Sequence, residues 1–546
     1  MSLGKFILDR LEEDADFVGQ VNVWRTFVKL KNISIAQREQ EELKNGPSLG
    51  LLFSGAKFRY QFATVKSWQM LQIDAITGEQ YTYKTMRERS VRCALWMRSQ
   101  GLLSGDLITI CSHNHLDIVM PCFAALYLGA VFNPLDATMN ASKSVHRMKF
   151  VHRMCISGEH ISFDEESASA VAEASKETKL ALKIIVFGRV AGFFEFESVI
   201  AEPEVDQVKS FMCAPIERPD QTAIVMCSSG TTGLPKGVAL SHEAILKQLF
   251  RSDEFSMTGN KCLIFSSLYW ISGTLSMLIN LASKVTRIIT PPFDECSACE
   301  IVEKHQVNCQ IMPNRFHLDD PFNCSIFPTD KLDHFVPNAV MTSVYGITEL
   351  GGVMSMQTAN SKPGSTGQII ENAQLKVIDP DTGRILGPNK TGELLLKAAS
   401  MMSYYCGDSR ATAETLDEKG SYGWLHSGDL GYYDEDGEIF VLDRLKQLIK
   451  YRGHHVSPFE LETVILSHPG VKEVAVVGVP HPVDDEHPVV TDMELVELVA
   501  AEVSDSKLLR GGVRFINSLP KSPSDKTRRK ELLDLAKSMG RIGINP

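Results

Sequence analysis

The chain has 546 residues, of which 44% are hydrophobic and 23% are charged. This composition is typical of a globular protein with about three or four core-forming units, and it excludes a chain that is disordered throughout. The formal net charge of -11 argues against a general nucleic-acid or acidic-membrane binder, because such partners require a cationic surface.

Short apolar runs alternate with helical patterns through the first part of the chain. Val91, Ala94 and Leu95 recur at helical spacing before Gly101 and form a core-facing stripe. Because strands and helices alternate after this point, the sequence predicts an α/β fold. The expected elements are a strand at 107–111, a helix at 116–128, a strand at 130–133 and a strand at 184–187.

Residues 118–135 form the most membrane-like stretch of the sequence. Pro121, Gly129 and Pro134 interrupt this stretch, whereas a membrane-spanning helix needs about 20 apolar residues without such breaks. We interpret it as a buried helix that leads into a strand, and we expect no transmembrane segment.

A segment rich in glycine and hydroxyl groups lies between an apolar strand at 223–226 and a helix expected to begin near Ser241. Glycines permit tight turns with free N–H groups, hydroxyls add donors and a lysine adds charge, so the segment favours phosphate oxygens. The GxxxxGK[ST] spacing of P-loop kinases and GTPases is absent. A flexible surface loop is the alternative interpretation. The candidate phosphate-binding residues are Ser228, Ser229, Gly230, Thr231, Thr232, Gly233 and Lys236.

Four later motifs contain further polar residues that are candidates for a functional site. The first, Tyr345-Gly-Ile-Thr-Glu349, contains a carboxylate suited to a hard cation, although its Thr-Glu pair could also begin a helix. The second places Asp429 in a Gly-rich turn, where an Asp is often only a turn residue. The third is the basic run 443–462, and the fourth is the Lys-rich segment 520–532 that contains Lys526. Solvated charged surfaces are the alternative for both.

The five motifs, in this order, resemble those of the acyl-adenylate-forming superfamily, which includes acyl-CoA synthetases, 4-coumarate-CoA ligases and insect luciferases. The resemblance implies that the segment 228–236 binds phosphates. It also implies that Tyr345 packs on adenine beside Gly346, that Thr348 contacts the α-phosphate, and that Glu349 holds Mg²⁺.

The same resemblance assigns the remaining motifs. Asp429 and Arg444 would contact the ribose, Asp443 would be a hinge, and Gly453 would leave room for the pantetheine arm of coenzyme A. Lys526 would be the adenylation lysine, which places a cation where two anions must meet. Thr348, Glu349 and Lys526 are thus the expected catalytic residues.

The chain also departs from the family pattern. The segment 293–345 is shorter than in relatives and lacks the Gly-Gly-Ala type of sequence that forms one wall of the adenine pocket, and 487–494 omits a strand. Asp525 stands where the family has Gly, and an acidic neighbour would partly cancel the field of the lysine after it. Trp270 replaces a His-rich element, either as a gate to the acyl pocket or as a core aromatic.

The resemblance implies a large multi-lobed N-terminal adenylation domain at residues 1–442 and a small mobile C-terminal α+β domain at 443–546. The expected activity is that of an ATP-dependent acid:CoA ligase that acts on fatty or aryl carboxylic acids through an acyl-AMP intermediate, with ATP, Mg²⁺ and coenzyme A. A degenerate non-catalytic relative, an incomplete gene model and a luciferase-like monooxygenase are the alternatives. The cytosol is the default location, and the last residues lack the Ser-Lys-Leu peroxisomal signal, so a peroxisomal location would need another route.

Overall fold

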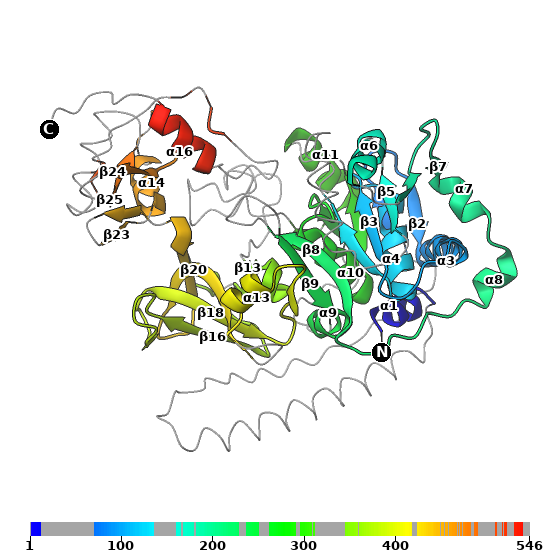
Figure 1. The fold of residues 1–546 in the computed structure, drawn as a ribbon, viewed down its shortest axis with the longest axis horizontal. Coiled ribbons are helices and arrows are strands. Elements are labelled where there is room, and N and C mark those ends of the chain that lie inside the picture. Colours follow the sequence, from blue (N-terminus) through cyan, green and yellow to red (C-terminus); the bar gives the residue numbers. More distant parts are fainter. Residues whose placement is uncertain are drawn as a thin grey trace, which may run out of the picture.

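The computed structural model describes most of the chain, and the fold below refers to that part. The described residues are 2–12, 70–135, 160–164, 168–178, 182–228, 236–249, 261–290, 295–307, 309–311, 344–358, 360–417, 423–447, 449–451, 454–456, 458–466, 468, 470–471, 473–481, 485–489, 499, 508–509, 516, 518–520 and 529–538. In Figure 1 the blue and green elements gather at one end and the orange and red C-terminal elements at the other.

An eight-stranded sheet forms the centre of the N-terminal part, with strand order β19-β9-β8-β4-β3-β5-β6-β7. The strands from β8 to β7 run parallel to their neighbours, whereas β9 and β19 are antiparallel additions at the other edge. The α/β prediction is therefore confirmed. The strands are β3 (Leu107–Cys111), β4 (Val131–Pro134), β5 (His160–Asp164), β6 (Leu182–Val186), β7 (Phe194–Glu195), β8 (Thr222–Ser228), β9 (Lys236–Ser241) and β19 (Tyr404–Tyr405).

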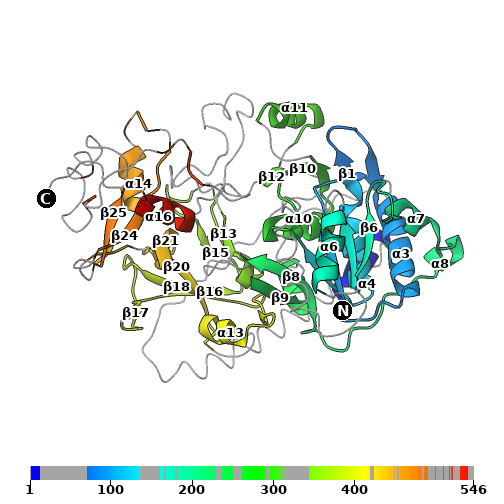
Figure 2. The same ribbon diagram turned by 45° about the horizontal axis from the view of Figure 1, so that its top comes forward.

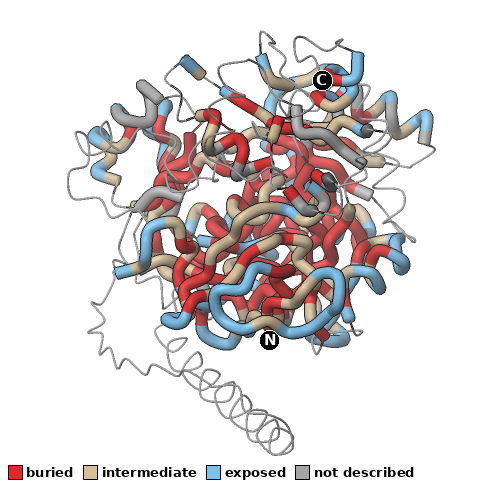
Figure 3. Tube along the Cα trace, turned by 90° about the vertical axis from the view of Figure 1, so that its left-hand side faces the viewer, coloured by how far each residue is buried: buried red, intermediate tan, exposed pale blue. Residues whose placement is uncertain are grey.

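Helices cover both faces of this sheet. On β3, Ile108 and Ile110 join the core that contains the α3 and α4 side chains, whereas Leu107 and Cys111 pack on the other face with α6. This alternation follows from the two-residue period of a strand. Buried residues fill the interior in Figure 3. The helices of this part are α1 (Leu3–Glu12), α3 (Tyr83–Ser99), α4 (Val119–Tyr127), α6 (Ala168–Thr178), α7 (Phe196–Ala201), α8 (Val205–Lys209), α9 (His242–Leu249), α10 (Ile271–Ala282) and α11 (Glu295–His305).

Two expected helices differ from the observed elements in detail, and the expected strands other than 107–111 are shifted or extended by one or two residues. The helix expected at 116–128 begins as the 3-10 turn η2 (Leu116–Ile118) and continues as α4. The helix expected near Ser241 begins at His242, and the sequence did not predict β9 before it. Among the described helices, none has the length and apolar character needed to cross a membrane.

A second, five-stranded sheet lies beside the first, with order β12-β10-β11-β1-β2. The parallel strands β12, β10, β11 and β1 are followed at one edge by the antiparallel β2. Its strands are β1 (Met70–Asp74), β2 (Gln80–Thr82), β10 (Lys261–Ile264), β11 (Thr286–Ile289) and β12 (Cys309–Ile311).

Two antiparallel sheets follow in the middle of the chain, with orders β13-β14-β15 and β17-β16-β18-β20-β21. The expected domain boundary at 443 falls near the end of β21, and the division into two domains stays a prediction. The elements are β13 (Val344–Ile347), η4 (Thr348–Leu350), β14 (Gly352–Met356), β15 (Gln368–Ile369), β16 (Ala373–Ile378), β17 (Ile385–Leu386), β18 (Gly392–Ala398), α13 (Ser409–Thr415), β20 (Leu425–Tyr433), β21 (Ile439–Arg444) and η5 (Leu445–Gln447).

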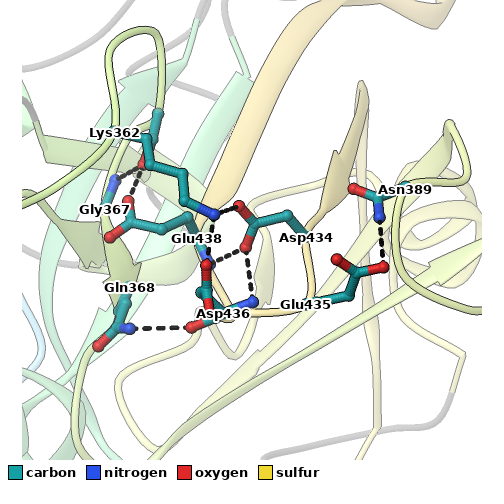
Figure 4. A network of polar contacts seen from close by, with 9 residues as sticks. Lys362, Gly367, Gln368, Asn389, Asp434, Glu435, Asp436 and Glu438 are labelled. Carbon is teal, nitrogen blue, oxygen red and sulfur yellow. Dashed lines mark hydrogen bonds and ion pairs between the residues drawn. The ribbon is translucent and has the colours of Figure 1, made fainter.

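A polar network ties these two sheets together at the turn before β21 (Figure 4). Lys362 Nζ lies 2.5 Å from both Asp434 Oδ2 and Asp436 Oδ2, and the Ser365 hydroxyl donates to Glu438. The backbone of Ile439 is paired in the same place, because its N–H donates to Gly367 O at 3.0 Å. The network therefore fixes the start of the strand that ends at Arg444.

The C-terminal part contains a four-stranded sheet of order β23-β22-β25-β24 with α14 and α16 nearby (Figure 2). Glu462 of α14 is buried and accepts hydrogen bonds from Arg529 Nη1 at 2.8 Å and from Val476 N at 2.6 Å. This pair links α14 to α16. The elements are β22 (Ile449–Tyr451), β23 (His454–Val456), α14 (Pro458–Leu466), β24 (Val477–His481), β25 (Asp485–Val489) and α16 (Arg529–Ser538).

Candidate active site

The expected phosphate loop joins the two strands of a hairpin. Ser228 ends β8 and is paired in register with Lys236, which begins β9. The residues between them, among them Ser229, Gly230, Thr231, Thr232 and Gly233, lie outside the described residues. Because β8 and β9 are mostly buried, the hairpin holds the two ends of the loop at a fixed separation.

Tyr345 and Asp429 meet although they lie on different sheets. Tyr345 Oη donates to Asp429 Oδ2 at 2.6 Å, and both residues are buried, with 7% and 3% of their surfaces exposed. Burial, together with the negative charge of Asp429, raises the pKa of the Tyr345 phenol well above its usual value. The phenol therefore remains a hydrogen-bond donor at neutral pH.

Arg444 completes this group from the neighbouring strand. Asp429 on β20 and Arg444 on β21 are paired in register, and Arg444 Nε lies 2.8 Å from Asp429 Oδ1. The Asp429 side chain is 4% exposed, whereas that of Arg444 is 47% exposed. The structure thus brings together three residues that the sequence assigned separately to the adenine and the ribose.

Gly346 allows the close approach that positions Tyr345. A Cβ atom at Gly346 would lie 2.2 Å from the carbonyl oxygen of Gly352, on the neighbouring strand β14. The pairing of β13 with β14 is irregular between Tyr345 and Gly346. Backbone packing against β14 therefore requires a residue without a side chain at position 346. The expected contact of Gly346 with nucleotide stays a prediction.

Thr348 and Glu349 follow on the 3-10 turn η4. Glu349 Oε1 accepts a hydrogen bond from Tyr405 Oη at 2.9 Å, and the Glu349 carbonyl accepts one from Met402 N at 2.8 Å. Burial and the charge of Glu349 raise the pKa of the Tyr405 phenol above its usual value. The Tyr405 phenol therefore keeps its proton at neutral pH and donates a hydrogen bond to this carboxylate.

At this place Glu349 would supply one carboxylate to a Mg²⁺ ion. Among the described residues, no group of three or more His, Cys, Asp or Glu side chains could hold a metal ion by itself. This donor set fits Mg²⁺ bound together with a nucleotide, because Mg²⁺ keeps several waters and is held by one or two carboxylates plus phosphate oxygens.

Lys236 contacts the ring of the same tyrosine. Its Nζ lies 4.6 Å from the centroid of the Tyr405 ring, within the range of a cation–π interaction. Lys236 and Glu349, which the sequence assigned to phosphate and to metal, therefore converge on one aromatic side chain. Tyr405 could not be predicted as a site residue from the sequence, since neither its spacing nor its neighbour Tyr404 marks it.

A second set of missed residues supports the turn before Asp429. Glu393 Oε1 accepts a hydrogen bond from Gly428 N at 3.3 Å, and its Oε2 lies 3.1 Å from His426 Nδ1. His426 Nε2 lies 2.7 Å from Asp417 Oδ1. The hydrogen bond with Glu393, reinforced by that with Asp417, raises the pKa of His426 to about 9, so the imidazole is charged at neutral pH.

Several of the other residues that the sequence singled out are not among the described residues. Gly453 and Lys526 are outside the described residues, as are Asp525, residues 312–343 and residues 490–494. Trp270 is half-buried before α10 and contacts Tyr269 edge to face, with ring centroids 4.8 Å apart. This contact is compatible with both the gate and the core-aromatic interpretations.

Comparisons with protein families cover most of the chain. Residues 64–318 and 329–406 match the family model "AMP-binding enzyme", and residues 460–526 match "AMP-binding enzyme C-terminal domain". The first model leaves residues 319–328 unmatched, and these lie within the segment 293–345, whose expected shortening stays a prediction.

Individual relatives agree with the family models. The chain is 33% identical over 505 residues to 4-coumarate--CoA ligase 3 of Oryza sativa subsp. japonica. The aligned region covers 84% of this chain and 88% of the relative. It is 30% identical over 509 residues to luciferin 4-monooxygenase of Nipponoluciola cruciata, covering 85% of this chain and 91% of that one.

Solved structures support the fold. ATP-bound MatB from Rhodopseudomonas palustris matches with a TM-score of 0.74 and 20% identity, covering 87% of this chain and 97% of that one. The o-succinylbenzoate CoA synthetase of Bacillus subtilis with its acyl-adenylate intermediate gives 0.70 at 21% identity, covering 87% and 96%.

Proposed function

Because the chain belongs to the AMP-binding enzyme family of the acyl-adenylate-forming superfamily, we propose that it is an ATP-dependent acid:CoA ligase for fatty or aryl carboxylic acids. The reaction would join a carboxylate to the α-phosphate of ATP with release of pyrophosphate, and coenzyme A would then displace AMP to give the thioester. The observation that best supports this proposal is the convergence of Lys236 and Glu349 on Tyr405, which brings a cation and a carboxylate to one aromatic side chain.

The nucleotide would be held by residues from several elements. Asp429 would accept hydrogen bonds from the ribose with Arg444 beside it, and Tyr345 would pack on adenine. Lys236 and the loop before it would contact the phosphates. When bound, Mg²⁺ at Glu349 would offset charge on the phosphates as pyrophosphate departs.

Lys526 is the residue proposed to act in adenylation. Its ammonium group would stabilise the charge that accumulates between the carboxylate and the α-phosphate. Loss of such a contact raises an activation free energy by about 3 to 4 kcal/mol, which is a factor of hundreds in rate. Thr348 would help to orient the same phosphate.

The test is acid-dependent ATP–pyrophosphate exchange and CoA-thioester formation with a panel of fatty acids, benzoate and 4-coumarate. We expect both activities in the wild type and a loss of several hundredfold in exchange in Lys526→Ala. Lys537→Ala, which removes an exposed lysine of α16, is the matched control and should keep wild-type activity. A wild type that shows neither activity with any acid contradicts the proposal.

Two alternatives have a specific observation in their favour. The unmatched residues 319–328 fit a degenerate relative or an incomplete gene model, for which a transcript that lengthens this segment is the distinguishing finding. The identity to a luciferin 4-monooxygenase fits an oxidative function, for which light emission with a luciferin and oxygen is the test.

A further inference from the structure

Tyr405 contacts two oppositely charged side chains that come from distant parts of the chain. Its hydroxyl donates to Glu349 Oε1 at 2.9 Å, and its ring centroid lies 4.6 Å from Lys236 Nζ. Only 6% of the Tyr405 surface is exposed. A buried tyrosine that contacts both a cation and a carboxylate restricts the positions of both.

The backbone around Tyr405 is held on two sides. Strand β19 pairs with β9, where Tyr405 faces Val238 and Cys406 N donates to Gly237 O at 2.7 Å. On the other side, Tyr405 N donates to Thr412 Oγ1 of α13 at 2.9 Å. These hydrogen bonds fix the backbone position of Tyr405, and thereby the point from which its side chain extends toward its neighbours.

The main chain also couples this segment to the carboxylate. Met402, three residues before Tyr405, donates its N–H to the carbonyl of Glu349 at 2.8 Å. Glu349 is thus bound to the segment 402–405 through its backbone and through its side chain. A shift of β19 would move the carboxylate with it.

The physical effect of these contacts is preorganisation. A hydrogen bond to an ionised carboxylate is shorter and stronger than one between neutral groups, and it selects one rotamer of Glu349. The face of the Tyr405 ring attracts the Lys236 ammonium and limits the freedom of a long side chain. Supporting residues of this kind determine whether a site has its productive geometry.

We propose that Tyr405 is a positioning residue, whose hydroxyl orients Glu349 toward the metal and whose ring orients Lys236 toward the phosphates. The inference rests on the proposed function, because Glu349 and Lys236 receive their roles there. Tyr405 would act only through Glu349 and Lys236, and it would contact neither the acid nor the reacting atoms.

Two substitutions separate the hydroxyl from the ring. Tyr405→Phe removes the hydrogen bond to Glu349 and keeps the ring beside Lys236, whereas Tyr405→Leu removes both. The probes are Mn²⁺, whose affinity for the protein with ATP is measured by electron paramagnetic resonance, and ATP in EDTA, measured by calorimetry.

We expect Tyr405→Phe to weaken Mn²⁺ binding by about tenfold and to leave the affinity for metal-free ATP unchanged. Tyr405→Leu should weaken both. The matched control is Tyr404→Phe, because Tyr404 is the exposed residue of the same strand and its hydroxyl lies 3.0 Å from Thr222 Oγ1. This control should bind both probes like the wild type.

Wild-type Mn²⁺ affinity in a folded Tyr405→Phe variant overturns the inference. So does a Tyr405→Phe effect that is equally large in a Glu349→Gln background, since the hydroxyl would then not act through Glu349. None of these measurements needs turnover. A wild type that binds Mn²⁺ and ATP but forms no adenylate or thioester therefore contradicts the proposed function alone, whereas one that binds neither contradicts both.

Discussion

His426 is a charged side chain whose ionisation is set by its two neighbours. The hydrogen bond to Glu393, together with that to Asp417, raises the pKa of His426 to about 9 from an ordinary value of 6.5. The folded state therefore binds the proton more tightly than the unfolded state. The resulting stabilisation is complete below pH 6.5 and is lost as the pH rises through about 9.

We expect the stability difference between the wild type and His426→Gln to shrink by about 1 to 2 kcal/mol between pH 6 and pH 10, allowing for partial solvent exposure. The measurement is urea unfolding of both proteins across this range, where groups that titrate in both cancel in the difference. A difference that stays constant with pH would show that His426 does not carry this linkage.

Only some of the individual site residues could be predicted from the sequence. The sequence motifs predicted Tyr345, Asp429 and Arg444 as site residues. In the structure Tyr345 and Arg444 both contact Asp429, and the roles of the three residues in binding nucleotide stay predictions. Tyr405 and His426 carried no such signal. Each owes its importance to a partner far away in the sequence, and a spacing pattern does not encode such a partner.

The turn η4 depends on a glycine that ends it. Gly351 has φ of +69°, and a Cβ atom there would lie 2.1 Å from the carbonyl oxygen of Ser400. Ser400 also donates its hydroxyl to the carbonyl of Leu350 at 2.9 Å. A side chain at this position would therefore push the turn that carries Glu349 away from the turn that follows β18.

We expect Gly351→Ala to lower the free energy of unfolding and to weaken ATP binding, because both strain and a backbone clash arise. Gly383 is the matched control, since it also has φ of +69° and a Cβ there would meet nothing within 4 Å. Gly383→Ala should cost only the left-handed strain of about 1 to 2 kcal/mol and leave ATP binding intact. Equal urea midpoints for the two variants would contradict the role of the clash.

At the scale of the whole molecule, the amino-terminal helix belongs to the main core. Phe6 of α1 is 1% exposed and lies in the same buried cluster as residues of α3, α4, β9 and β20. Gly4 permits the contact, because a Cβ there would be 2.0 Å from the carbonyl oxygen of Leu126. The helix α1 is thus part of the main core of the N-terminal part.

We expect Phe6→Ala to destabilise the protein by about 3 to 5 kcal/mol, the range for truncation of a buried phenylalanine. Leu103→Ala is the control, because Leu103 is 69% exposed and its loss should change stability by less than about 0.5 kcal/mol. Urea unfolding checks both values. An unchanged midpoint in Phe6→Ala would mean that α1 does not pack on the core.

The α/β class, the strand at Leu107–Cys111 and the family could be predicted from the sequence, because local periodicity and ordered motifs depend on residues that are near one another in the chain. Only the folded chain shows that Lys236 and Glu349 both contact Tyr405, and that Tyr345 donates a hydrogen bond to Asp429. These contacts join segments that are distant in the chain. They follow from how β9, β19, η4 and β20 pack, which depends on the burial of all these elements at once.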